Sequence, residues 1–215
     1  MRAVTDHNPN VLLVDAVRRL ERYGLRADIS ISLRSGGGLL ITPGNIESDQ
    51  LTAEEVVFIA RDGGIKGRGQ PARDWAVHQA IYVAHADVQA VVHVQSTYAT
   101  ALACLERPLP AFHHRVAVAG GDSVPCVPYQ MPGSPGLSKA VADGLARRHA
   151  CLIAHDGLVA TGTSLVHAIS IAIEIEFLCR SYLAALAVGE PPRLERAEIA
   201  QVLEQLRTYS RARWA

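Results

Sequence analysis

No sign of charge predominates in this sequence. Lysine and arginine together number 21, aspartate and glutamate also number 21, and the formal net charge is therefore zero. Proteins that bind nucleic acid or lie on anionic membranes usually carry a clear excess of positive charge. We therefore expect neither a nucleic acid nor a membrane as a partner.

The sequence also lacks an uninterrupted apolar run long enough to span a bilayer. The longest apolar stretch, residues 165–188, contains Glu174, Glu176 and Arg180, and a spanning helix needs about 20 predominantly apolar residues. The first ten residues contain no apolar core of a signal peptide. These features predict a cytoplasmic protein.

Closely spaced cysteines are missing as well. The four cysteines are far apart and form neither a CxxC pair nor a zinc-finger pattern. Isolated cysteines in apolar segments usually behave as small buried hydrophobic residues. We therefore expect no structural zinc site and no disulfide framework.

The pattern of apolar residues predicts one α/β domain that covers residues 1–215. Hydrophobic residues make up 49% of the 215 residues, which is enough for a large core. Strands and helices do not alternate strictly, so a central, mostly antiparallel sheet flanked by helices fits best. Helices are expected at 11–23, 74–85, 98–105, 137–145, 164–188 and 195–207. Strands are expected at 29–33, 39–42, 56–60, 88–95, 116–118, 124–127, 150–154 and 158–160, with a tail at 208–215.

The segment AVVHVQS at 90–96 places two polar residues in a buried strand. Because successive side chains of a strand alternate between its faces, His93 and Gln95 share one face. Buried polar groups need hydrogen-bond partners. The pair therefore marks either a hydrogen-bonded pair in the core or the wall of a pocket.

Other polar residues gather where predicted elements begin or end. Asp74 starts a helix, the pair 113–114 lies between strands, and His155 and Asp156 lie in a turn. Imidazoles and carboxylates are suited both to binding a divalent metal and to general acid–base catalysis. Spacing alone leaves both interpretations open.

The order of six segments resembles the class II aldolase/adducin family over about residues 10–210. The segments are ADISISLR, LLITPGNI, QPARDWAVHQAIY, DVQAVVHVQSTYATALA, AVAGGDSVPCVPYQMPGS and LIAHDGLVATG. The resemblance implies a three-layer α/β/α fold and a homotetramer whose active sites lie between subunits. It also implies a zinc ion on three histidines, with an acidic residue nearby that acts as acid and base.

The metal-binding positions of the family are only partly kept. His93 matches the first histidine, whereas Gln95 and Asp156 stand where the other two are expected. His155, which precedes Asp156, is a further candidate ligand. Since two of three imidazoles are replaced, the resemblance implies one divalent ion (Zn, Mn, Fe or Mg), with zinc bound less tightly than by three imidazoles.

The resemblance also assigns candidate catalytic residues. Asp74 matches the acidic residue, one methylene shorter than the glutamate of the family. His114 takes the position of a tyrosine that assists proton transfer across the subunit interface, and Tyr209 matches a second such tyrosine.

The residues expected to bind the substrate differ from a phosphate pocket. Asp28 replaces an asparagine, and a carboxylate there should repel a phosphate. Ala72 and Arg73 replace two serines, and the guanidinium of Arg73 is suited to grip a carboxylate or another anion in place of a phosphate. Asn45 follows a glycine that is shifted by one position. With Gln95 as a hydrogen-bonding group, these residues predict a substrate that is not a sugar phosphate.

The resulting prediction is a lyase that cleaves or forms a C–C bond in a small hydroxy-carbonyl or carboxylate compound, by aldol chemistry or decarboxylation. One alternative is a metal-free homologue that acts as a dehydratase, isomerase or cyclase. Another is a non-catalytic subunit of the adducin type. Single residues also have plainer interpretations, with Asp74 as a helix cap, Asp156 as a turn residue and Arg73 as a solvated charge.

Overall fold

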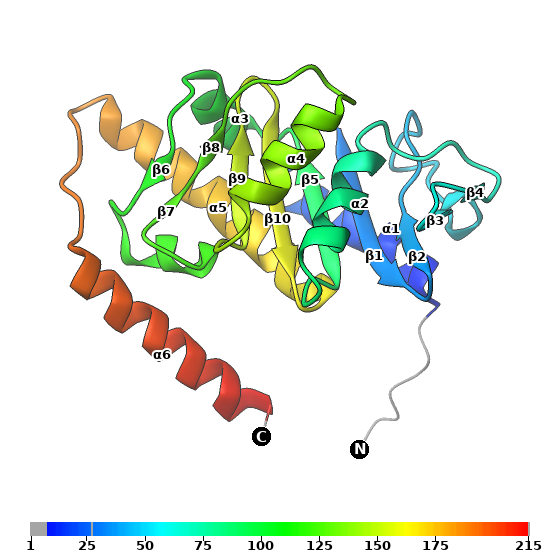
Figure 1. The fold of residues 1–215 in the computed structure, drawn as a ribbon. Helices are drawn as coiled ribbons and strands as arrows, with labels where there is room; N and C mark the ends of the chain where they lie inside the picture. The colour runs from blue at the N-terminus through cyan, green and yellow to red at the C-terminus, as the bar shows by residue number, and fades with distance from the viewer. Residues whose placement is uncertain (1–7, 27, 215) are drawn as a thin grey trace.

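The fold is a sheet between two layers of helices (Figure 1). The structure is a computed structural model, and it describes residues 8–26 and 28–214. The α-helices are α1 (Pro9–Arg22), α2 (Trp75–Ala84), α3 (Thr97–Cys104), α4 (Pro135–Gly144), α5 (Leu165–Leu186) and α6 (Arg196–Trp214). Two 3-10 helices are η1 (Ala53–Glu55) and η2 (His114–Ala119).

The main sheet has eight strands in the order β4-β3-β2-β1-β5-β10-β9-β8. Among the described residues, its only parallel pair is β8 with β9. The strands of this sheet are β1 (Ile29–Ser35), β2 (Gly38–Ile41), β3 (Val57–Ala60), β4 (Ile65–Lys66), β5 (Ala90–Val94), β8 (Cys126–Val127), β9 (Ala150–Ile153) and β10 (Gly157–Gly162). A separate short sheet joins β6 (Leu109–Pro110) to β7 (Ser123–Val124). The prediction of an α/β fold with a mostly antiparallel central sheet is confirmed.

Two hydrophobic cores lie on opposite faces of the sheet. Val92 and Val94 of β5 belong to the core that α1, α3 and α5 cover, whereas Val91 belongs to the core under α2 and α4. Figure 1 shows α2 and α4 together on one side of the sheet. His93 lies between Val92 and Val94 in sequence and therefore faces α2, as the alternation of a strand requires.

Three of the α-helices begin at a side chain that caps their free N–H groups. Asn8 accepts from Asn10 N at the start of α1, Ser134 caps α4 and Ser164 caps α5. Asp74 precedes α2 in the same way, yet its side chain makes no capping hydrogen bond. The expectation that Asp74 serves as a helix cap is therefore wrong, and its carboxylate is available for other contacts.

Two predicted segments have a different structure. Residues 116–118 form part of η2 instead of a strand, since a short apolar run does not distinguish a strand from a buried helical turn. Residues 208–214 continue α6 instead of forming a tail, because no glycine or proline interrupts them. Across the described residues, no helix is both long and apolar enough to cross a membrane.

A buried carboxylate anchors the start of α3, the helix that follows β5. Glu176 of α5 is 7% exposed. It accepts hydrogen bonds from Ser96 Oγ at 2.6 Å, Tyr98 N at 2.9 Å and Ala99 N at 2.8 Å. Since the N–H groups at a helix start have no partner within the helix, this carboxylate ties α3, and with it the end of β5, to α5.

We expect Glu176→Ala to lower the free energy of unfolding by about 3 kcal/mol, because several buried donors lose a charged acceptor. Urea unfolding measures this loss. Glu174→Ala, on the same helix, removes a partly exposed ion pair with Arg115 and should cost about 1 kcal/mol or less. Equal losses in the two variants would contradict the anchoring role.

Candidate active site

The candidate active site is built around His93, at the centre of the sheet. Its strand, β5, pairs with β1 on one side and β10 on the other, with Ser30 and Val159 as the residues opposite His93. His93 is 6% exposed. Its Nδ1 lies 2.5 Å from Asp74 Oδ2, and since a carboxylate only accepts, Nδ1 donates.

Asp74 receives three hydrogen bonds on the same oxygen. Besides His93, Ser30 Oγ donates to Asp74 Oδ2 at 2.5 Å, and His78 Nε2 lies 3.2 Å from it. His78 is fully buried and stands four residues after Asp74, one turn further along α2. The start of α2 therefore holds the carboxylate against β1 and β5.

The other nitrogen of His93 faces Asp156, in the turn between β9 and β10. His93 Nε2 lies 3.5 Å from Asp156 Oδ2 and makes no hydrogen bond to any described residue. Gln95 Nε2 donates to Asp156 Oδ1 at 2.8 Å. His93, Gln95 and Asp156 thus face one another, and a buried imidazole nitrogen is left without a hydrogen bond between them.

The two carboxylates change the pKa of His93, and His93 changes theirs. Burial disfavours the charged imidazolium, but the carboxylate of Asp156 at 3.5 Å and the hydrogen-bonded carboxylate of Asp74 outweigh it and raise the pKa of His93 to about 10. Burial also opposes ionisation of the acids. The neighbouring imidazoles of His78 and His93 nevertheless hold the pKa of Asp74 well below its ordinary value, and the imidazole of His93 lowers the pKa of Asp156.

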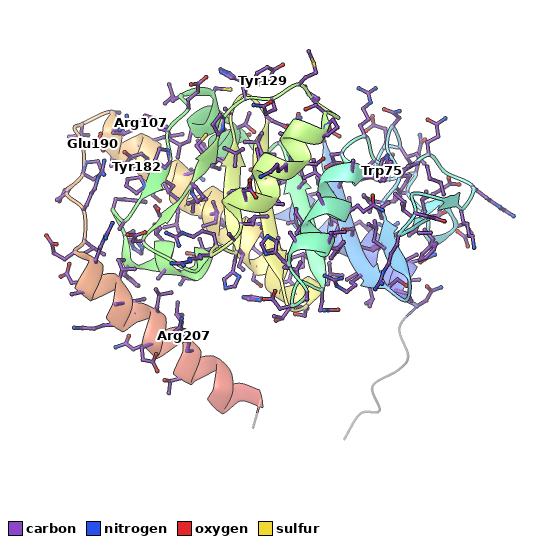
Figure 2. All side chains as sticks on the ribbon, viewed as in Figure 1. Trp75, Arg107, Tyr129, Tyr182, Glu190 and Arg207 are labelled. Carbon is purple, nitrogen blue, oxygen red and sulfur yellow. The ribbon has the colours of Figure 1, made fainter. Side chains whose placement is uncertain are left out.

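Asp74, His93, Gln95 and Asp156 line a cavity of about 490 Å³. Arg73, Asp28 and Tyr129 also line it. Figure 2 shows Tyr129 on the loop before α4 and Trp75 at the start of α2, both towards the same end of the sheet. A neighbouring pocket of about 540 Å³ shares Asp28 and Arg73 and adds Asn45 and Arg26. A small molecule fits this pair of pockets by size, and Arg26 and Arg73 are the groups that would bind an anionic part of it.

The structure brings together most of the predicted site residues. Asp74, His93, Gln95 and Asp156 form one hydrogen-bonded or ion-paired group. The interpretation of Asp156 as a turn residue only is therefore too narrow. Three further predicted residues lie around the cavities: Asp28, Arg73 and Asn45.

Three predicted residues are not part of this group. His155 borders the cavity, but its Nε2 lies 3.0 Å from Glu106 Oε1 and its side chain is 48% exposed, because the backbone turns through a positive φ there. His114 lies exposed in η2 and stacks on His113. Tyr209 lies in α6, and its side chain is outside the described part of the structure.

Sequence reasoning missed two residues that contact Asp74. Ser30 and His78 were read as ordinary strand and helix residues, yet both bind its carboxylate. The signals were present, since His78 follows Asp74 at helical spacing i, i+4 and Ser30 alternates with apolar residues in β1. Only the pairing of β1 with β5 places Ser30 opposite His93.

A model of the family described as "Class II Aldolase and Adducin N-terminal domain" matches residues 11–183. That match covers most of the chain, and the chain therefore belongs to the class II aldolase and adducin family. Two relatives and one solved structure described next are named as aldolases, so the lyase class predicted from the sequence is supported as well.

One relative is a 5-methylthioribulose-1-phosphate/5-deoxyribulose-1-phosphate aldolase of Rhodospirillum rubrum, 40% identical over 92% of this chain and 90% of the relative. The L-fuculose phosphate aldolase of Escherichia coli K12 is 39% identical over 92% of this chain and 93% of the relative. A solved L-fuculose 1-phosphate aldolase has a TM-score of 0.88 at 29% identity, covering 92% of this chain and 95% of that one. The structure of YgbL from Escherichia coli, titled a putative aldolase/epimerase/decarboxylase, has a TM-score of 0.81 at 27% identity, covering 91% and 97%.

These names conflict with the expectation of a substrate that is not a sugar phosphate. That expectation rests on the carboxylate of Asp28 and on Ala72 and Arg73 in place of two serines. In the structure Asp28 is exposed, and the pocket that it borders also contains Arg26 and Arg73. Glu21 and Glu47 line the same pocket, so its charge is mixed, and the guanidinium groups of Arg26 and Arg73 are the groups in it that bind an anion.

In protein kept free of metal with a chelator, we expect the free energy of unfolding to fall as the pH rises from 6.5 to 8.5. The folded state keeps the proton on His93, whose pKa is raised from 6.5 to about 10, while the unfolded chain releases it. Stability from this group is complete below pH 6.5 and declines by at most about 1.4 kcal/mol per pH unit above it. Urea unfolding across this range measures the slope.

The matched variant for this measurement is His93→Gln, which removes the titrating group. Its stability should depend less on pH in the same range. Parallel pH curves for the variant and the original protein would show that His93 is not held as an imidazolium between the two carboxylates.

Proposed function

We propose that this protein is a carbon–carbon lyase of aldol type whose substrate is a small phosphorylated hydroxy-carbonyl compound. The observation that carries the proposal is the orientation of His93, which Asp74 holds through Nδ1 while Nε2 faces Asp156 and the cavity. Membership of the aldolase family supports the reaction type, and the names of the relatives support a sugar phosphate.

The chain's own residues have distinct tasks in this proposal. Asp74 lines the cavity and is 19% exposed, so it is placed to take a proton from the substrate and return it. Gln95 and Asp156 orient hydroxyl or carbonyl groups of the substrate. Arg73, between the two pockets, attracts the anionic group.

A divalent ion fits the donors around His93 Nε2. This buried nitrogen makes no hydrogen bond to the described residues, and Asp156 and the Gln95 carboxamide lie beside it. Among the described residues, no group of three His, Cys, Asp or Glu side chains is placed to hold a metal ion. One imidazole, one carboxylate and one carboxamide would therefore suit an ion that keeps several waters, such as Mn²⁺ or Mg²⁺. If bound beside His93, Gln95 and Asp156, a divalent ion would supply Lewis-acid stabilisation of negative charge on a substrate oxygen.

A second candidate function is acid–base chemistry without a metal, in a dehydratase, isomerase or cyclase. The observation that favours it is the direct approach of Asp156 to His93 Nε2, at 3.5 Å. An imidazolium between two carboxylates donates a proton from Nε2 without any ion.

We also propose that the protein is a homotetramer with active sites at the subunit interfaces. His114 lies exposed in η2, and Tyr209 lies in α6, which contacts the rest of the chain chiefly through η2. Figure 1 shows α6 extending away from the sheet. Both residues are therefore candidates to reach the site of a neighbouring subunit.

We expect His93→Gln to lower kcat/KM for aldol cleavage by at least about 100-fold, because Nε2 faces the reacting atoms in this proposal. The assay follows the release of dihydroxyacetone phosphate from 5-methylthioribulose 1-phosphate and L-fuculose 1-phosphate. Circular dichroism tests whether the variant is folded. His85→Gln, at the far end of α2, is the matched control. A folded His93→Gln protein with unchanged turnover would overturn the proposal.

We expect Gln95→His to raise the affinity for zinc by about 10-fold or more, since it adds an imidazole on the same face of β5 as His93. Equilibrium dialysis followed by elemental analysis measures the binding of Zn²⁺ and Mn²⁺. The control Gln79→His places the new imidazole on α2, beside Ala60, and should leave zinc binding unchanged.

The same measurement on the original protein separates the two candidate functions. About one Mn²⁺ or Mg²⁺ per chain, together with lyase activity that a chelator abolishes, supports the metal-dependent lyase. Full activity in chelator without bound metal would contradict it and support the metal-free alternative.

A further inference from the structure

A chain of buried polar side chains continues from Asp74 into the interior, away from the cavity. It consists of His78 and Tyr82 on α2 and Ser30 and Ser32 on β1. All four are buried, with exposed fractions from 0% for His78 and Ser32 to 7% for Tyr82. Neither Ser32 nor His78 lines the cavity that contains His93.

Neighbouring side chains in this series lie within hydrogen-bonding distance of one another. His78 Nδ1 lies 2.7 Å from Ser32 Oγ, and Ser32 Oγ lies 2.9 Å from the Tyr82 hydroxyl. On the other side of the ring, His78 Nε2 lies 2.9 Å from Ser30 Oγ and 3.2 Å from Asp74 Oδ2. Both ring nitrogens of His78 therefore have partners although the residue has no exposure to solvent.

With a neutral His78 ring, the donors and acceptors of this series give a consistent arrangement of protons. An ionised carboxylate only accepts, so His78 donates from Nε2 to Asp74, and the unprotonated Nδ1 then accepts from Ser32. Ser32 in turn accepts from the Tyr82 hydroxyl. Every hydrogen bond then runs from Tyr82 towards Asp74, and hydrogen bonds that point the same way strengthen one another.

We propose that His78 is a positioning residue for His93. Together with Ser32 and Tyr82 it fixes the carboxylate of Asp74, which in turn fixes the ring of His93 so that Nε2 faces the cavity. Burying this series of polar side chains costs desolvation free energy unless each of them forms its hydrogen bonds. Such a network gives the site a single geometry that the strand alone does not impose, because χ2 of a histidine is broadly distributed.

This inference deepens the proposed function and rests on it only for the kinetic part of its test. His78→Leu removes both hydrogen bonds, and His78→Gln keeps a donor near the place of Nε2. Outer partners of functional histidines typically contribute 10- to 100-fold to activity. We expect His78→Leu to lower kcat for aldol cleavage by about that factor with little change in KM, and His78→Gln to recover most of the loss.

A second readout does not depend on activity. The Nδ1 proton of His93, bonded to Asp74, should give a protected resonance far downfield in the proton NMR spectrum. We expect His78→Leu to shift this resonance and to speed its exchange with solvent, whereas His85→Gln, directly after the end of α2, should leave it unchanged. A folded His78→Leu protein with an unaltered His93 resonance and unaltered kcat would overturn the proposal.

The milder variant Ser32→Ala keeps the proposal testable if His78→Leu fails to fold. It removes the donor to His78 Nδ1 and leaves the ring in place. We expect it to shift the Nε2 proton of His78 and, to a smaller extent, the Nδ1 proton of His93, and two unchanged resonances would contradict the proposal. If the unmodified protein has no lyase activity, the proposed function is refuted. The NMR measurements still decide whether His78 positions His93.

Discussion

The hydrogen bond between His93 Nδ1 and Asp74 Oδ2 is the interaction on which the geometry of the site depends. It joins the central strand β5 to the first residue before α2, and it determines which nitrogen of His93 faces the cavity. A buried imidazole between two carboxylates costs desolvation energy, and the mutual attraction of the three groups offsets it. The polar side chains of the site therefore keep their positions only if the surrounding elements hold them there.

That support comes from both helical layers. On one face, α2 carries Asp74 and His78 to the sheet. On the other face, Glu176 of α5 holds the start of α3, directly after Gln95 and Ser96. Asp74, just before α2, thus holds His93 within β5, and Glu176 of α5 holds the segment that follows the strand. The turn that carries Asp156 follows from the pairing of β9 with β10. The end of the central strand is therefore held by side chains from three different parts of the fold.

The resemblance to the family places Gln95 and Asp156 where two histidines are expected, and in the structure both residues lie close to His93. Gln95 donates to Asp156, so the two replaced residues satisfy each other while both remain beside His93. Oxygen donors in these places favour ions that prefer oxygen, or proton transfer by His93 itself. Class II aldolase membership thus establishes the fold and the general reaction class, and the altered residues bear on the ion and the substrate.

The sequence by itself determined the family, the mostly antiparallel sheet, the shared face of His93 and Gln95 and the importance of Asp74 and Asp156. These follow from local patterns: the alternation of a strand and the order of motifs along the chain. Only the tertiary structure decided that Asp74 binds His93 instead of capping α2, that His155 turns towards Glu106, and that Ser30 and His78 belong to the site. The physical reason is that those contacts join residues of different elements, and which elements meet depends on strand pairing and helix packing that local spacing does not encode.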